Sequence, residues 1–232
     1  MLAFILNKLD DLVQKKNLKI LKKNLPKKLN LYIDVGAHNG EMAEIVSKYF
    51  NINKLFLFEP NPDCLQNLKK LKKKNVEIFN CALGREEKNV ILNIGHISSM
   101  STINKIENRS SYTFLKKILI NLFYLKKNIY KKKVLVKQIP LYKILKKKKI
   151  KKIDFIKIDT EGYEYNVLKG LKEYIEDINI LLIECHYDNS LIKNYNFKSI
   201  NNFLLKKDFR LISKNKMLFR KGYEIIYKKN II

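Results

Sequence analysis

The chain has 232 residues, of which 46% are hydrophobic and 30% charged, a balance that excludes a disordered chain and allows a sizeable core. Its formal charge of +26 is compatible with a nucleic-acid or anionic-membrane partner. We give the charge little weight, because only four of the 48 basic residues are Arg and the abundance of Lys, Asn, Ile, Tyr and Phe is typical of AT-rich codons.

The cysteine pattern and the lengths of the apolar segments indicate the cellular compartment to expect. Cys64, Cys81 and Cys185 are far apart and odd in number, so they predict neither a disulfide framework nor a zinc site, and they favour a reducing, cytoplasmic compartment. No stretch reaches the roughly 18 apolar residues of a membrane span. The short apolar start lacks the charged region and cleavage site of a signal peptide.

Residues 1–28 are predicted to form an N-terminal amphipathic helical extension that closes near Pro26. Its apolar positions have helical spacing: Leu2, Ile5, Leu9, Leu12 and Val13. We expect this face to pack on the edge of the core. The alternative is an interfacial helix that gives the protein a peripheral place on a membrane.

Residues 29–232 alternate strand and helix patterns. The near-continuous apolar strands separated by helices predict an α/β fold with a mostly parallel, doubly wound sheet. The last segments predict an antiparallel C-terminal edge. The expected strands are Leu31–Val35, Lys54–Phe58, Val76–Asn80, Phe155–Ile158, Ile180–Glu184, Phe209–Ser213, Met217–Arg220 and Glu224–Tyr227; the expected helices are Glu41–Phe50, Pro62–Lys74 and Tyr165–Ile175.

A helical insertion is predicted at about 104–133, with basic and aromatic residues between Phe114 and Lys127. The segment is too long for a plain connection. We consider a lid, a substrate-binding insertion and a membrane-facing helix; the simplest alternative is an insertion that covers its own core.

The glycine turn after the first strand predicts a ligand site. Its pattern is Asp34-x-Gly36-x-x-x-Gly40 at the start of a helix, where free N–H groups and glycines allow close approach of a ligand. Glu59 ends the second strand 19 residues beyond Gly40, where an acid can bind both ribose hydroxyls of a nucleoside. An acid before the glycines suits a cationic group, such as the amino group of S-adenosylmethionine (SAM), better than a pyrophosphate.

These motifs make the chain resemble the FkbM-type methyltransferases, SAM-dependent enzymes with a Rossmann-like class I fold, over about residues 31–188. The most specific motif is Lys157-x-Asp159-x-Glu161-Gly162-x-Glu164. The chain departs from the family pattern in two places, and both bear on the identity of the methyl acceptor more than on the cofactor. Leu141-Tyr142-Lys143 stands where the family often has Leu-Asp-Asp, and the insertion at about 104–133 is not part of the shared pattern. The matching pieces are residues 33–40, 58–62, 82–84, 98–101, 156–164 and 182–186.

The resemblance implies roles for individual residues. Asp159, Glu161 and His186 are the candidates for a catalytic base, with Asp159 first. The implied cofactor contacts are Asp34, Gly36, Ala37, His38 and Gly40 for the methionine end, Glu59 and Pro60 for the ribose, Asn80, Cys81, Ala82 and Leu83 for the adenine, and Asp159.

Simpler roles compete for the same residues. Asp159 or Thr160 could cap the following helix, and Glu161 and Glu164 could be favourable first-turn charges. His186 taken alone is more often a satisfied polar partner than a base.

A divalent cation on Asp159, Glu161, Glu184 and His186 is chemically reasonable, but no tight local motif supports it, and we assign no metal site.

The leading hypothesis is therefore SAM-dependent O-methylation of a hydroxyl on a glycan or small metabolite. The alternatives are an RNA methyltransferase and a non-enzymatic protein that binds anionic membrane surfaces.

Overall fold

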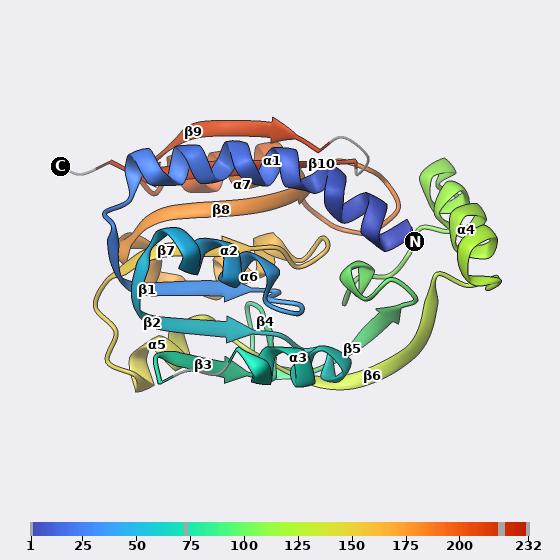
Figure 1. The fold of residues 1–232 in the computed structure, drawn as a ribbon, viewed down its shortest axis with the longest axis horizontal. Coiled ribbons are helices and arrows are strands. Elements are labelled where there is room, and N and C mark those ends of the chain that lie inside the picture. Colours follow the sequence, from blue (N-terminus) through green and yellow to red (C-terminus); the bar gives the residue numbers. More distant parts are fainter. Residues whose placement is uncertain (1, 72–73, 218–220, 231–232) are drawn as a thin grey trace.

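The computed structural model describes residues 2–71, 74–217 and 221–230, with the backbone alone for residues 2–11. Its main sheet has seven strands in the order β3-β2-β1-β7-β8-β10-β9. The five strands from β3 to β8 run parallel, and β10 is antiparallel to both of its neighbours. The strands are β1 (Lys28–Val35), β2 (Asn51–Phe58), β3 (Val76–Phe79), β7 (Ile153–Ile158), β8 (Ile178–His186), β9 (Phe209–Lys216) and β10 (Gly222–Lys229). The predicted α/β fold with an antiparallel C-terminal edge is confirmed (Figure 1).

Helices cover both faces of this sheet. Neighbouring residues of β1 point to opposite faces: Leu31 and Ile33 join one apolar cluster, while Tyr32 between them joins another. Burial on both faces explains why the central strands read as continuous apolar runs. The first cluster includes residues of α5 (Leu141–Lys147), α6 (Glu164–Lys169) and α7 (Phe197–Leu205); the second includes residues of α1 (Leu2–Asn24), α2 (Glu41–Tyr49) and α3 (Leu65–Lys70).

The N-terminal extension forms one helix, α1, beside β9 and β10 (Figure 1). Leu18 and Leu21 are buried, and Asn17 donates a hydrogen bond to Glu224 of β10. Val13 of the expected apolar face is buried, but Leu12 is exposed. The other members of that face, Leu2, Ile5 and Leu9, lie among the residues whose side chains are not described. In the described part of the chain, no helix combines the length and apolar character needed to cross a membrane.

Three predicted elements have different bounds. The Pro62–Lys74 helix is a 3-10 turn, η1 (Pro62–Cys64), followed by the short α3. The Tyr165–Ile175 helix is α6 followed by a second 3-10 segment, η3 (Lys172–Asp177). The break falls at Gly170, where an added Cβ would lie 2.1 Å from the carbonyl oxygen of Gly84. In the predicted Met217–Arg220 strand, Met217 lies outside β9 and β10, and residues 218–220 lie outside the described residues.

A second sheet, β4-β6-β5, was missed. It contains β4 (Ala82–Leu83), β5 (Lys88–Gly95) and β6 (Tyr130–Ile139), and β5 pairs antiparallel with β6. The pairing brings together residues about 40 apart in sequence, and β6 is lysine-rich and largely exposed, so its period-2 signal is weak.

The predicted insertion is helical only in α4 (Ser111–Tyr124); a short 3-10 turn, η2 (Ser98–Met100), precedes it, and residues 130–133 belong to β6. Figure 1 shows α4 beyond the carboxyl ends of the parallel strands.

Candidate active site

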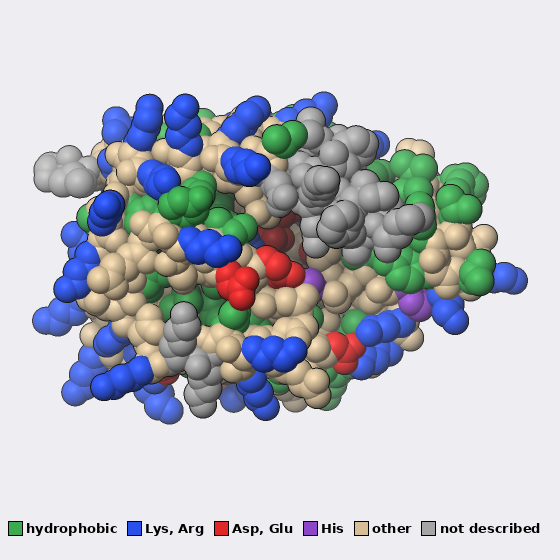
Figure 2. All heavy atoms as spheres, viewed as in Figure 1, with side chains coloured by type: hydrophobic (Ala, Val, Ile, Leu, Met, Phe, Trp, Pro, Cys, Tyr) green, Lys and Arg blue, Asp and Glu red, His purple; other side chains and the backbone are tan. Residues whose placement is uncertain are grey.

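A cavity of about 360 Å³ lies at the carboxyl ends of the central strands. Figure 2 shows a hollow on this face with acidic side chains near its centre and Lys or Arg side chains mostly toward its edges. Most of the predicted site residues line the cavity: Gly36, Ala37, His38, Glu59, Pro60, Cys81, Ala82, Leu83, Asp159 and Glu161. Four others are not among its lining residues: Asp34, Gly40, Asn80 and His186.

The glycine turn joins the ends of three strands. Gly36 has a φ of +75°, and an added Cβ would lie 1.8 Å from the backbone oxygen of Asp159, so only glycine allows β1 and β7 to approach this closely. The N–H groups of Gly36 and Ala37 both donate to the carbonyl of Phe58 at the end of β2. Gly40 precedes α2 with a φ of +89° and packs against Leu71. It therefore sets the backbone conformation of the turn on the side away from the cavity.

Glu59 is held at the cavity wall by backbone donors. One carboxylate oxygen accepts the N–H of His38 at 2.8 Å, and the other accepts the N–H of Asn61 at 2.7 Å. Burial raises the pKa of Glu59 and the two N–H groups oppose that rise. Because each carboxylate oxygen has a second lone pair, Glu59 can still accept hydrogen bonds from a ligand on the cavity side. Asn80 supports this segment by donating to the Glu59 carbonyl.

His38 connects the glycine turn to η2. Its ring lies 2.7 Å from the Ser98 hydroxyl through Nε2 and 2.9 Å from Glu41 through Nδ1. Burial by itself lowers the pKa of His38, but hydrogen bonds with Cys64 and Glu41 raise it to about 10. The same pair lowers the pKa of Glu41 to about 2, against the effect of its burial. The turn is therefore locked by a charged pair.

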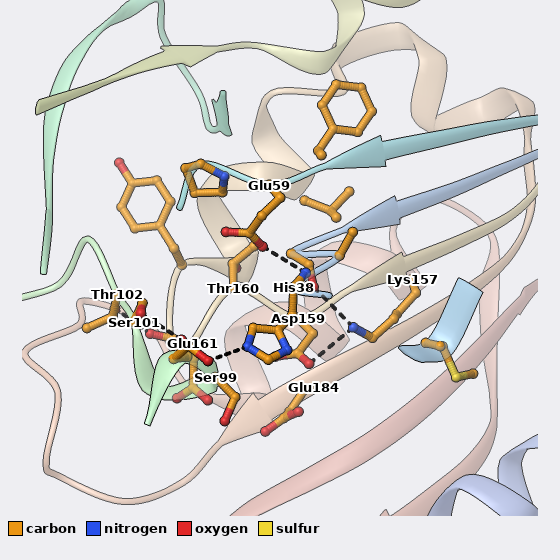
Figure 3. Close-up of a pocket in the computed structure, with 18 of the residues that line it drawn as sticks. His38, Glu59, Ser99, Ser101, Thr102, Lys157, Asp159, Thr160, Glu161 and Glu184 are labelled. Carbon is orange, nitrogen blue, oxygen red and sulfur yellow. Dashed lines mark hydrogen bonds and ion pairs between the residues drawn. The ribbon is translucent and has the colours of Figure 1, made fainter. Parts of the chain in front are cut away.

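Behind the turn, Asp34, Lys157 and Asp159 form a charged row. The Lys157 ammonium lies 3.1 Å from Asp159 (Figure 3) and 3.5 Å from Asp34. Although burial opposes its charge, these two carboxylates hold the pKa of Lys157 above its usual value. Asp34 is fully buried, and burial raises its pKa above the ordinary value. Lys157 thus orients the Asp159 carboxylate at the cavity, while the buried Asp34 carboxylate holds the charge of Lys157 from the other side.

The loop after β7 is held in a strained conformation by hydrogen bonds to its backbone. Glu161 has a φ of +49°, a left-handed conformation that costs a non-glycine residue about 1 kcal/mol or more. Thr102 donates to its carbonyl at 2.7 Å, and Glu164 accepts the N–H groups of Thr160 and Gly162 from below.

The helix-capping alternative for Asp159 and Thr160 is wrong, because α6 begins after Tyr163 without a side-chain cap. Glu164, at the first position of α6, holds the loop that carries Glu161.

Glu161, Glu184 and His186 converge beside this loop. The Nε2 atom of His186 lies 3.4 Å from Glu161 and 3.2 Å from Glu184, and all three side chains are buried. Glu184 and His186 point to the same side of β8, since strand residues two apart share a face. Burial by itself lowers the pKa of His186, but the carboxylates of Glu161 and Glu184 raise it to about 9.

Sequence reasoning missed the far wall of the cavity. His96, which carried no signal in the sequence, lines it and stacks near Tyr124 of α4. Residues 98–101 are among the segments that match the FkbM pattern, but the sequence analysis assigned them no function. These residues come together only because β5, η2 and α4 fold back over the strand ends, an arrangement that the sequence pattern did not predict.

Comparison with known proteins places this geometry in a family. Residues 34–211 match the model of the methyltransferase FkbM domain. The hexuronic acid methyltransferase AglP of Haloferax volcanii is 24% identical over 156 residues, which are 66% of this chain and 54% of that protein. The chain thus spans about half the length of this curated relative.

Two solved structures share the fold at low identity. The FkbM methyltransferase of Methylobacillus flagellatus has a TM-score of 0.56 and 16% identity, covering 87% of this chain and 44% of that one. The magnesium protoporphyrin IX methyltransferase of Synechocystis, solved with bound SAM, has a TM-score of 0.51 and 9% identity, covering 97% and 79%. With the family match over three quarters of its length, this chain belongs to the FkbM methyltransferase domain family.

Proposed function

We propose that the protein is a SAM-dependent methyltransferase that methylates a hydroxyl of a sugar-containing or similar small acceptor. The observation that carries the cofactor assignment is Glu59, which both backbone N–H groups fix at the cavity wall with lone pairs left for two ribose hydroxyls. Family membership and the AglP likeness support the reaction and the acceptor class. When bound, SAM supplies a methyl group on a cationic sulfonium.

The residues of the cavity fit the parts of such a cofactor. Gly36 and Ala37 leave the turn open for close approach, and Ala82 and Leu83 offer an apolar wall for a base. Cys81 belongs to the same wall, and burial raises the pKa of its thiol to about 11, so the wall is uncharged. We assign Asp34 and Gly40 to the support of the turn, since they do not line the cavity.

Calorimetry with S-adenosylhomocysteine tests the cofactor site. Glu59→Ala removes the two ribose acceptors, and we expect at least a tenfold loss of affinity, since hydrogen bonds to a charged group contribute about 1.5–3 kcal/mol. Glu44→Ala, an exposed carboxylate on α2, is the matched control and should bind as the wild type does. Equal affinity in a folded Glu59→Ala protein contradicts the ribose assignment.

Asp159 is the candidate base for the acceptor hydroxyl. It is partly exposed to the cavity, and Lys157 fixes its carboxylate. A base held in this way can take the hydroxyl proton while the cavity walls align the oxygen with the methyl group.

Transfer of a labelled methyl group from SAM to uronic acid glycosides, neutral glycosides and tRNA tests the acceptor class. Labelling of glycosides supports the proposal, whereas labelling of tRNA alone overturns it in favour of the RNA alternative.

A specific surface also supports peripheral contact with an anionic membrane. The outer face of α4 exposes large apolar side chains at helical spacing: Phe114 (65%), Ile118 (47%) and Leu122 (69%), with Leu115, and Leu125 just after the helix. Figure 2 shows these hydrophobic side chains gathered at one end of the molecule. Lys126 and Lys127 follow the helix, and the chain carries +26 overall, so an anionic lipid surface complements this end.

Sedimentation with vesicles tests this contact. We expect binding to phosphatidylglycerol vesicles, no binding to phosphatidylcholine vesicles, and release at high salt. Phe114→Ser with Leu122→Ser should abolish binding. Ile91→Ser with Leu135→Ser, an exposed cross-strand pair of β5 and β6, removes similar apolar area elsewhere and should leave binding unchanged. Equal loss in both double variants contradicts a specific role of α4.

A further inference from the structure

We infer that Glu161, Glu184 and His186 form a binding site for a divalent cation such as Mn²⁺; the two glutamates line the cavity described above. Two carboxylates and one imidazole are a ligand set that manganese, iron and related cations accept. The ligand atoms come from the loop after β7 and the end of β8 and lie within 4.8 Å of one another. The cation's part in methyl transfer rests on the proposed function; the site itself does not.

The distances around His186 fit shared coordination. Ligands about 2.1 Å from one cation lie roughly 3.0–3.5 Å from each other. The Nε2 atom of His186 is 3.4 Å from the Glu161 carboxylate and 3.2 Å from that of Glu184. Neither contact has hydrogen-bond geometry at Nε2, although the side chain is 95% buried and this atom is inaccessible to solvent. The imidazole nitrogen is thus aimed between two carboxylates.

The other ring nitrogen has the surroundings of a metal-binding histidine. Nδ1 of His186 faces the buried carboxylate of Asp188 at 3.7 Å. Asp188 is oriented in turn by the N–H of Ser190 at 2.7 Å. A carboxylate on the far side of the ring is a common companion of a metal-binding histidine; here it is an ion-pair contact without hydrogen-bond geometry.

The cluster gathers ionisable groups in a buried place. The carboxyl groups of Glu161, Glu184 and Asp188 surround one imidazole, and all four residues are buried. Lys193, which lies beside them, donates to the backbone carbonyls of His186 and Asp188. Buried charge is costly unless it is paired or coordinates a metal.

Two of the proposed cation ligands line the cavity in which we place the methyl transfer. Glu161 and Glu184 line the same cavity as Asp159. Figure 3 labels Glu161, Glu184 and Asp159 among the residues that line this cavity. A cation there would bind an acceptor oxygen and lower its affinity for the proton that Asp159 takes.

Titration of the tag-free protein with Mn²⁺, without SAM, tests the site. Calorimetry should show one site, and Glu161→Gln and Glu184→Gln should each weaken binding about tenfold or more. Glu41→Gln removes a carboxylate from the same cavity outside the cluster and should bind Mn²⁺ within about twofold of the wild type. Absence of binding, or equal binding in all variants, overturns the site.

Electron paramagnetic resonance on wild-type protein provides a second measurement that needs no variant. Bound Mn²⁺ should show coupling to an imidazole nitrogen, and ¹⁵N-histidine labelling should change that coupling. Its absence overturns the site even if the buried variants do not fold. Mn²⁺ binding without S-adenosylhomocysteine binding would leave the cation site standing and refute the proposed function instead.

Discussion

The two sides of the cavity are built in different ways. The proposed cofactor side consists of the turn Gly36–His38, Glu59 and the Cys81–Leu83 wall, and it is shaped mainly by backbone atoms within about 50 residues of chain. The proposed acceptor side consists of Asp159, Glu161, Glu184, η2 and α4, and it is shaped by side chains from four distant segments. On the proposed function, the first side would bind the cofactor, which is the same for every acceptor, and the second would bind the acceptor through side chains that single substitutions can change.

The largest expected effect that distinguishes the two sides is the loss of turnover in Asp159→Asn. Loss of the proposed base should lower kcat by about 10²–10⁴, with S-adenosylhomocysteine affinity nearly unchanged, because general-base catalysis acts only in the transition state. Turnover with labelled SAM and calorimetry measure the two quantities. Asp177→Asn, an exposed acid just before the opposite end of β8, is the control. A turnover within about threefold of wild type contradicts the role of Asp159.

Gly36→Ala tests whether the two sides meet through backbone contact. The new Cβ would meet the Asp159 carbonyl at 1.8 Å in a left-handed conformation, so we expect a loss of about 3 kcal/mol or more in the free energy of unfolding. Gly162→Ala on the acceptor side meets only side chains, of Asn104 and Leu191, and should cost about 1 kcal/mol. Urea unfolding of both variants measures the difference. The reverse order would show that the β1–β7 contact is not the tighter constraint.

The same contrast explains what the sequence could predict. The strands, Gly36, Glu59 and the Ala82–Leu83 wall are encoded by short spacings and apolar runs, and the structure gathers them at one cavity. Asp34 was expected to touch the ligand, but its position one residue before the strand end buries it beneath Lys157. A pattern identifies the residue at a strand end but not the direction of its side chain.

The missed elements depend on contacts between distant segments. The β5–β6 pairing, and with it the position of His96 and Tyr124 at the cavity, depends on registers between residues about 40 apart. Likewise, the sequence offered His186 as a candidate base or as a polar partner, but its contact with Glu161 depends on how the loop after β7 lies against β8. Local periodicity cannot report either pairing.

The smallest effect concerns the ion pair of His38 and Glu41 at the cavity mouth. Because the pKa of His38 is raised from 6.5 to about 10, its stabilising contribution is full below pH 6.5 and is lost as the pH rises through about 10. Because the pKa of Glu41 is lowered from 4.5 to about 2, that contribution is full above pH 4.5 and is lost as the pH falls through about 2. The pair should therefore stabilise most between about pH 4.5 and 6.5, by less than about 1 kcal/mol since Glu41 is half exposed.

Urea unfolding of wild type and Glu41→Gln across this range measures the contribution. The difference between the two proteins should be largest near pH 5.5 and should shrink steadily toward pH 9, and the pKa of His38 followed by NMR should fall in the variant. Glu44→Gln, one turn along the same helix, should show neither change, because its side chain makes no hydrogen bond to the turn among the described contacts. A difference that stays constant from pH 5.5 to 9 would mean that Glu41 acts through packing, and that the mouth of the cofactor side is held by shape and not by charge.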